Sequence, residues 1–416
     1  MKLSLSRLKL VNSKDSMSII EIAIIVFLFA AYLFPAFSIG ATAFIAIILM
    51  YCAYLVIVDK KLAPIVLKSL VLIVIIAVFY MLLTDTSSIA QNVSNRTLKR
   101  FMSKFYQYLT LYFPALLFLR VKKKADKRQK MWITAIGIAF MLYVIITTWI
   151  FLIENPNATR EWDNVNETNT ENIANYYFIY AVPIIIATIT IIITKVKGYA
   201  KLIPLGLIAA GIFFLINAQY TLSILITIIG VLIQLFRNLR SQISKAVFLF
   251  AALLMLIFTP QILKLAIENI ESEQVTIRLS EIYAFLTGQG AGGYNLNARL
   301  TLYGKTIGAF LRSPLWGNKQ LGFDGHATFL TVLSDTGILG GIPFYALLSL
   351  VCKSIGERLN NSKAQFNVIV TMFIMMGLTN PVHASKPLGL ATWFLAPLII
   401  SLIFEEDNKN ETPLEN

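Results

Sequence analysis

Long apolar runs constrain this chain more than any other feature of its sequence. Runs of about 17 to 23 mostly apolar residues cross a hydrocarbon core of roughly 30 Å as helices, and lipid permits few alternatives. Twelve such runs occur, near residues 17–37, 41–58, 64–83, 104–121, 131–153, 173–194, 202–217, 220–237, 244–263, 338–355, 366–383 and 389–404. The sequence therefore predicts an all-α polytopic membrane protein with about twelve transmembrane helices. Its content of 57% hydrophobic and 14% charged residues agrees with this class.

The distribution of lysine and arginine orients these helices, because cytoplasmic loops carry an excess of both residues. With the N-terminus in the cytoplasm, six basic stretches fall inside, at 2–14, 60–61, 120–130, 195–201, 237–245 and 353–363. Residues 1–404 then form one helical domain, and the short acidic tail at 405–416 is also cytoplasmic. The segments 154–172 and 264–337 are expected outside.

Charge and cysteine content exclude several classes of function. The formal net charge of +14 is accounted for by topology, with some attraction to anionic lipid, and gives no support to nucleic-acid binding. Cys52 and Cys352 both fall in predicted spans. They imply neither a disulfide framework nor a metal cluster.

The outer segment 264–337 is where we expect the chemistry. A connection of about seventy residues without a full span is too long to be incidental. Apolar and polar residues alternate through ILKLAIENI and TIRLSEIYAFL, so composition does not mark it as disordered. The GQGAGG run at 288–293 has no preceding strand and no following Lys-Ser or Lys-Thr pair, so we interpret it as a hinge between two surface helices.

Arginines in this segment are candidate phosphate ligands, because a planar guanidinium binds phosphate oxygens in pairs and stays charged. One helix is expected over residues 299–311, where the following Ser-Pro pair ends it. Arg299 flanks its predicted buried stripe and is expected to face a cleft together with Arg278. Lys305 and Arg312 lie opposite and are expected to face water. The stripe consists of Leu300, Tyr303, Ile307, Phe310 and Leu311.

Basic residues also break the charge asymmetry in the outer segment before the fourth span. Arg96, Arg100 and Lys104 have spacings that place several cations together on a helix. Two interpretations stay open: a basic patch for an anionic ligand or lipid headgroup, and a solvated juxtamembrane helix. Glu21 and Lys68, near the inner ends of their spans, are expected to snorkel.

His326 is one of two histidines in the chain. Asp324 is a good N-cap, so a second helix is expected to start there and to hold His326 in its first turn. Free N–H groups and the helix dipole disfavour a protonated imidazole at that position, and a neutral imidazole can act as a base. The other histidine, His383 in TNPVHASKPLG, is a further candidate together with Lys386.

The stretch GFDGHATFLTVLSDTGILGG resembles a signature of the family of O-antigen ligases and Wzy-like polysaccharide polymerases. In that signature a histidine opens a helix that ends in an acidic residue and a glycine pair before the next span. The upstream match is Arg299, followed by a helix and the SPLWGN turn at 313–318, and the resemblance covers about residues 200–400. The matching positions are His326, Asp335, Gly337 and Gly340.

Two positions depart from the family pattern. Ala327 follows the histidine where the family often has asparagine, and no arginine stands at the outer start of the span near Tyr220. One phosphate ligand is therefore missing, and Arg278 or the patch that includes Arg96 and Arg100 is expected to substitute. Asp335 is out of helical phase with His326, so we expect it to have a structural role, with Gly337 permitting close backbone packing.

The resemblance implies a GT-C-like glycosyltransferase in the bacterial cytoplasmic membrane, with both termini in the cytoplasm. It would polymerise repeat units of a capsule, exopolysaccharide or O-antigen at the outer face, and transfer glycan between polyprenyl diphosphate-linked oligosaccharides without metal or cofactor. The implied catalytic residues are His326 and Arg299. The implied partners are membrane lipid, a flippase and a chain-length regulator.

Other functions stay open on the sequence alone. A ligase of the same family would move a finished glycan to a different acceptor. A lipid-linked oligosaccharide flippase or another transporter would show repeated halves and ionisable residues near the midplane. The polar residues instead concentrate in one outer segment, and the two halves look unlike each other, which favours outer-face chemistry.

Overall fold

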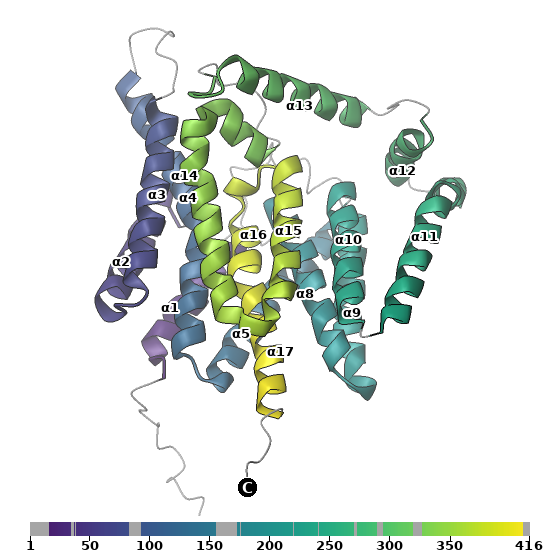
Figure 1. Ribbon diagram of the computed structural model, residues 1–416, viewed down its shortest axis with the longest axis horizontal. Coiled ribbons are helices and arrows are strands. Elements are labelled where there is room, and N and C mark those ends of the chain that lie inside the picture. The colour runs from purple at the N-terminus through teal and green to yellow at the C-terminus, as the bar shows by residue number, and fades with distance from the viewer. Residues whose placement is uncertain are drawn as a thin grey trace, which may run out of the picture.

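The computed structural model describes residues 16–34, 37, 39–82, 93–154, 173–174, 176–218, 220–239, 241–269, 273–288, 294–318 and 327–410. Within these residues all regular structure is helical, which confirms the predicted all-α class (Figure 1). The N-terminal helices are α1 (Ile19–Leu33), α2 (Ala41–Val58), α3 (Ala63–Leu82), α4 (Val93–Lys124) and α5 (Lys127–Glu154). Next come α7 (Tyr176–Ile179), α8 (Ala181–Lys195), η3 (Gly198–Lys201), α9 (Leu202–Asn217), α10 (Thr221–Asn238) and α11 (Gln242–Asn269).

The C-terminal part of the chain contains the surface helices and a second set of apolar helices. The surface helices are α12 (Glu273–Leu286) and α13 (Tyr294–Arg312). The remaining elements are α14 (Thr328–Leu359), η4 (Asn360–Ser362), α15 (Lys363–Thr379), η5 (Val382–Ala384), α16 (Lys386–Leu390), the π-turn η6 (Ala391–Leu395) and α17 (Ala396–Asn410).

Helix length and hydropathy identify a multi-pass membrane protein. Within the described residues, seven helices are long and apolar enough to cross a membrane, or eight if the bent pair within α11 is one span. Each of the twelve predicted apolar runs overlaps a helix, and the predicted 41–58 and 202–217 coincide with α2 and α9. Twelve crossings remain a prediction.

The bundle has two distinct ends. Helix α13 lies across one end, and α17 extends to the other (Figure 1). We call these the α13 end and the α17 end. The positive-inside pattern predicts that the α17 end is cytoplasmic, because the basic last turn of α4, at 122–124, lies there (Figure 1).

The centre of the bundle is formed by α4 and the C-terminal run from α16 to α17. In that run 83% of the apolar window is buried, against 22% in the run from η3 to α9. Trp393 of η6 is fully buried and packs on Phe373 of α15 with ring centroids 4.8 Å apart. Peripheral helices such as α9 therefore present apolar side chains toward lipid, and the C-terminal run packs inside protein.

Two glycines, Gly317 and Gly337, allow the 313–318 turn to pack closely against the backbone of α14. Gly337 has a φ of 64° and breaks α14 at a kink, and a Cβ there would collide with the Leu315 carbonyl. A Cβ at Gly317 would collide with the Asp335 carbonyl in return, and one at Gly340 would reach Phe79 of α3 at 3.3 Å. The close backbone packing predicted for Gly337 is confirmed, whereas a Cβ at Gly340 would meet the side chains of Thr336 and Phe79. Three backbone hydrogen bonds connect the 313–318 turn to α14. They run from Asn318 N–H to the Ser334 carbonyl at 2.7 Å, from Ile338 N–H to the Pro314 carbonyl at 2.8 Å and from Leu339 N–H to the Leu315 carbonyl at 3.2 Å.

Two expectations for this segment are wrong. Helix α14 begins at Thr328 after an extended Ala327, and not near Asp324, so no continuous helix runs from that residue into the bundle. The predicted apolar stripe of α13 is not its buried face either. Its buried residues are Thr306 and Ala309, and Leu300, Ile307 and Leu311 are exposed. The prediction assumed that the apolar side chains of a helix pack against protein. This assumption fails for a surface helix of a membrane protein, because its apolar side chains can face lipid instead.

Candidate functional site

Lys104 of α4 is the central cation of a cluster at the α13 end. Its ammonium lies 4.6 Å from the centroid of the Tyr80 ring of α3, and its Nζ is 3.5 Å from His383 Nε2. Asp335 of α14 acts on Lys104 electrostatically. In the described part of the chain no carboxylate lies within the 4.0 Å of an ion pair with Lys104. The cation is therefore held mainly by an aromatic face and an imidazole, and part of its charge is not neutralised.

His383 of η5 is 9% exposed, and both of its ring nitrogens have partners. Its Nδ1 is 3.0 Å from the hydroxyl of Thr328, which donates its own hydrogen to the Asn380 carbonyl at 3.1 Å. The hydroxyl oxygen must therefore accept the Nδ1 hydrogen. This assigns the Nδ1–H tautomer and leaves the Nε2 lone pair to accept from Lys104.

The charge state of His383 follows from the same surroundings. Burial, followed by the charge of Lys104, holds the pKa of His383 well below its usual range. The imidazole is thus neutral near pH 7. Since both nitrogens are engaged and the ring is buried, His383 positions the Lys104 ammonium and is not itself placed to take a proton from a ligand.

Local sequence explains why this imidazole sits where it does. Pro381 cannot continue α15, so the chain leaves the helix at Asn380 and turns through η5. Ser385 then caps α16, accepting from Leu388 N–H at 3.2 Å, and its hydroxyl donates to the Tyr177 carbonyl at 2.7 Å. The TNPVHASKPLG sequence thus forms a short rigid connection that carries His383 and Lys386.

Aromatic and amide groups complete the wall around the imidazole. The ring of Tyr108, one turn after Lys104 on α4, stacks on His383 with centroids 6.1 Å apart. The Tyr180 hydroxyl donates to Asn380 Oδ1 at 2.8 Å, which ties the end of α15 to α8. These contacts from α4 and from the start of α8 fix the position of His383 and Asn380.

Lys386 is a second cation at the same end, on the first turn of α16. Its ammonium lies 5.3 Å from the centroid of the Phe44 ring and 5.6 Å from that of Tyr106. Like Lys104, it has no carboxylate within ion-pair distance in the described residues. Lys104 is thus held over the Tyr80 ring of α3, and Lys386 over the Phe44 ring of α2 and the Tyr106 ring of α4.

The residues predicted from sequence fall into two groups. His383 and Asp335 both act on Lys104 at the α13 end, a link that the sequence alone did not show, and Lys386 lies three residues after His383 over other rings. Of the others, Arg100 is exposed on the first part of α4. His326 lies outside the described residues, as do the side chains of Arg96 on α4, Arg278 on α12 and Arg299 on α13.

Several members of the cluster were missed by sequence reasoning. Lys104 was seen only as part of a basic patch, and Thr328, Asn380 and Tyr108 were not singled out. One signal was available: Lys104 and Tyr108 are four residues apart, so they share a helix face. The pairing of Thr328 with His383, 55 positions apart, has no sequence signal.

A second charged cluster lies at the α17 end. Glu21 of α1 accepts from Arg120 Nε of α4 at 2.7 Å, and both side chains are 5% exposed. Asp59, in the turn after α2, accepts from Lys123 Nζ at 2.6 Å. Burial favours a higher pKa for Asp59, but the hydrogen bond and charge of Lys123, together with the N–H groups of Leu62 and Lys61, outweigh it and lower that pKa. The expectation that Glu21 snorkels to the surface is wrong, because a buried partner was 99 residues away.

The arrangement at the α13 end suits an anion. In the described part of the chain no three His, Cys, Asp or Glu side chains gather as metal ligands. Instead, the Lys104 ammonium lies against the Tyr80 ring and a neutral imidazole. The Lys386 ammonium lies over Phe44 and Tyr106 on the other side of α4. Ammonium groups without carboxylate partners attract anionic oxygens, and aromatic faces accommodate apolar or sugar rings.

The sequence was compared with protein-family models and with curated proteins. No family model matches the sequence, and no curated protein matches it.

Proposed function

We propose that this chain is a metal-independent glycosyltransferase of the bacterial cytoplasmic membrane, a polymerase of polysaccharide repeat units. It takes glycan from a polyprenyl diphosphate-linked donor and joins it to a second polyprenyl diphosphate-linked oligosaccharide. The single observation that supports this most is that, within the described residues, neither Lys104 nor Lys386 has a carboxylate at ion-pair distance. Both lie at the end that the charge pattern predicts to be external.

The reaction needs a place for negative charge. The bond between the anomeric carbon and the diphosphate oxygen breaks, a bond from that carbon to the acceptor hydroxyl forms, and the hydroxyl proton passes to a base. Lys104 and Lys386 would stabilise the charge that grows on the leaving diphosphate, together with Arg299 and Arg278. Cations that are already in position and desolvated are most effective when that charge appears.

The base in this proposal is His326, because His383 is neutral but has both nitrogens engaged. His383 instead orients the Lys104 ammonium. Asp335 partly offsets the positive charge of Lys104. The lipid tails would lie against the apolar outer surfaces of the bundle, and a ligase would differ from this scheme only in its acceptor.

Transfer by purified protein tests the proposal. Wild type in nanodiscs with its polyprenyl diphosphate-linked repeat unit should give a ladder of longer lipid-linked glycans. Lys104→Met, Lys386→Met, His326→Ala and Arg299→Ala should each lower the rate by about 10² to 10³. Lys305→Met, which removes an exposed lysine of α13, is the control and should keep the wild-type rate.

Three results would overturn the proposed polymerase. Unchanged ladders in both Lys104→Met and Lys386→Met would remove these cations from the reaction. Transfer only to a different acceptor would identify a ligase. A flippase is the second candidate, favoured by the inward position of Lys104, His383 and Asp335 in one bundle. It would move lipid-linked glycan across proteoliposomes and make no new linkage.

A further inference from the structure

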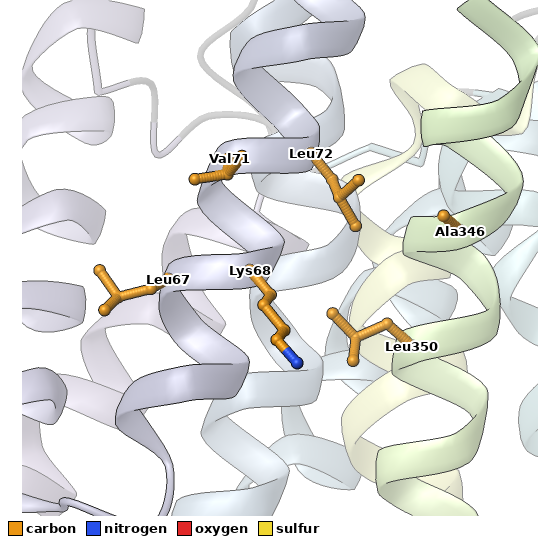
Figure 2. Close-up of a pocket in the computed structure, with 6 residues that line it drawn as sticks. All are labelled: Leu67, Lys68, Val71, Leu72, Ala346 and Leu350. Carbon is orange, nitrogen blue, oxygen red and sulfur yellow. The ribbon is translucent and has the colours of Figure 1, made fainter.

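An apolar groove runs along the outer wall of the bundle, between α3 and α14. It holds about 450 Å³ and lies away from the Lys104 cluster. Figure 2 shows its two walls, one from each helix, with a single nitrogen between them. Its lining consists of Leu67, Lys68, Val71, Leu72, Ala346 and Leu350.

The shape of the groove suits a hydrocarbon chain. Leu67 and Val71 on the α3 side are 51% and 56% exposed, although they belong to an apolar helix that would span the membrane. On the α14 side, Ala346 leaves the most room in the groove, because its side chain is the smallest of the six that line it. Together they form an elongated apolar surface that lipid, and not water, would cover.

Lys68 is the one charged residue that lines the groove. It is five residues into α3, about 7.5 Å along the helix from its start at the α17 end. Its side chain points from α3 toward Leu350 of α14, into the groove (Figure 2). In the described part of the chain it has no hydrogen bond and no ion pair, unlike Lys353 of α14, which lies 3.9 Å from Glu357.

Further positive charge lies where the groove meets the membrane surface. Lys60 and Lys61 are exposed in the turn that leads into α3. Asp59 in the same turn is already bound by Lys123, so it does not neutralise them. The groove thus has an apolar length, an ammonium group within it and a basic rim at the α17 end.

We propose that this groove binds an anionic glycerophospholipid. One acyl chain lies along Leu67, Val71, Ala346 and Leu350, and the phosphate reaches Lys68. Basic pockets between transmembrane helices hold anionic headgroups in this way. A zwitterionic lipid brings a cation of its own toward Lys60 and Lys61, so it is disfavoured. The inference is independent of the proposed transfer reaction.

Native mass spectrometry of the purified full-length chain tests this site. The protein is given equal amounts of phosphatidylglycerol and phosphatidylcholine, and bound lipid is counted on the intact ion. Wild type should retain phosphatidylglycerol in preference. Lys68→Gln should lower that retention about fivefold, the effect of one basic residue at an anionic lipid. Ala346→Phe should lower it by filling the groove.

The control is Lys201→Gln, which removes an exposed lysine of η3 from outside the groove. It should retain lipid as wild type does. Size-exclusion elution and the unfolding temperature of each variant show that the bundle is intact, since the altered side chains are exposed. Equal retention of the two lipids by wild type, or wild-type retention by both groove variants, would overturn the proposal.

Discussion

Helix α4 has differently paired cations at its two ends. At the α17 end, Arg120 forms an ion pair with Glu21 at 2.7 Å, and Lys123 forms one with Asp59 at 2.6 Å. At the α13 end, Lys104 instead contacts the imidazole of His383 and the phenol ring of Tyr80. The first cluster pairs each cation with an anion. In the second, two ammonium groups have no carboxylate at ion-pair distance among the residues that the structure describes. Helix α4 therefore carries cations neutralised by carboxylates at one end, and a cation held by an imidazole and an aromatic ring at the other.

The difference indicates which cluster holds the bundle together and which can take a ligand. A buried ion pair is costly to form and more costly to break, because the remaining partner is then buried without compensation. A cation over an aromatic ring has a weaker attachment and can still accept an anion. Four variants can break or sharpen this distinction.

Glu21→Ala should have the largest effect on stability. It leaves the buried Arg120 guanidinium without its closest partner, and we expect a loss of roughly 3–5 kcal/mol in the free energy of unfolding. Thermal unfolding in detergent measures this. The matched control is Glu357→Ala, whose partner Lys353 is 75% exposed, and its effect should stay below about 1 kcal/mol. Equal effects of the two variants would contradict the distinction.

Gly337→Ala should come next, because the kink that presents Asp335 to the α13-end cluster depends on it. A positive φ at a non-glycine residue costs about 1–3 kcal/mol, and the new methyl group would collide with the Leu315 carbonyl. Gly304→Ala in α13 is the control, since nothing lies within 4 Å of its Cβ position. That change should stabilise the helix by up to about 1 kcal/mol. Unfolding midpoints that move the same way would refute the kink's role.

His383→Asn should flatten the pH dependence of stability. The pKa of His383 is lowered by burial and by Lys104, so below its unfolded value of about 6.5 the unfolded chain binds the extra proton. Its contribution is complete above pH 6.5 and is lost as the pH falls, with a slope of up to about 1.4 kcal/mol per pH unit. Unfolding midpoints at pH 7.5, 6.5 and 5.5 measure the slope. An identical slope in wild type and variant would show that the imidazole is not held neutral.

Lys104→Met should have the smallest effect on stability. The lost cation–π contact and hydrogen bond are each worth about 1 kcal/mol, and relief from desolvating the ammonium offsets them. We expect a net change within about 1 kcal/mol in the same unfolding assay. A loss as large as that of Glu21→Ala would mean that Lys104 is a structural cation like Arg120.

The fold was largely predictable because apolar runs of spanning length have few alternatives in lipid. The ends of α2 and α9 followed directly from hydropathy, and the packing of Gly337 followed from its place before a new span. The face of α13 did not follow, because an apolar residue such as Ile307 packs equally well on protein or on lipid, and its sequence phase does not distinguish them.

The site was predictable only in part, for a different reason. His383, Lys386 and Asp335 were noticed as chemically able residues, but the closest link between them is Lys104, which is 279 positions from His383. No periodicity connects residues at that separation. The same holds for Glu21 and Arg120, each of which resembles an ordinary charge near a helix end.

Ligand-induced stabilisation tests most directly whether the α13-end cluster is an anion site. The unfolding temperature of wild type is measured with geranylgeranyl diphosphate and with geranylgeraniol, which lacks the charge. We predict that the diphosphate raises it and the alcohol does not. The rise should be lost in Lys104→Met and kept in Lys305→Met. A rise of the same size in Lys104→Met, or none in wild type, would contradict the account.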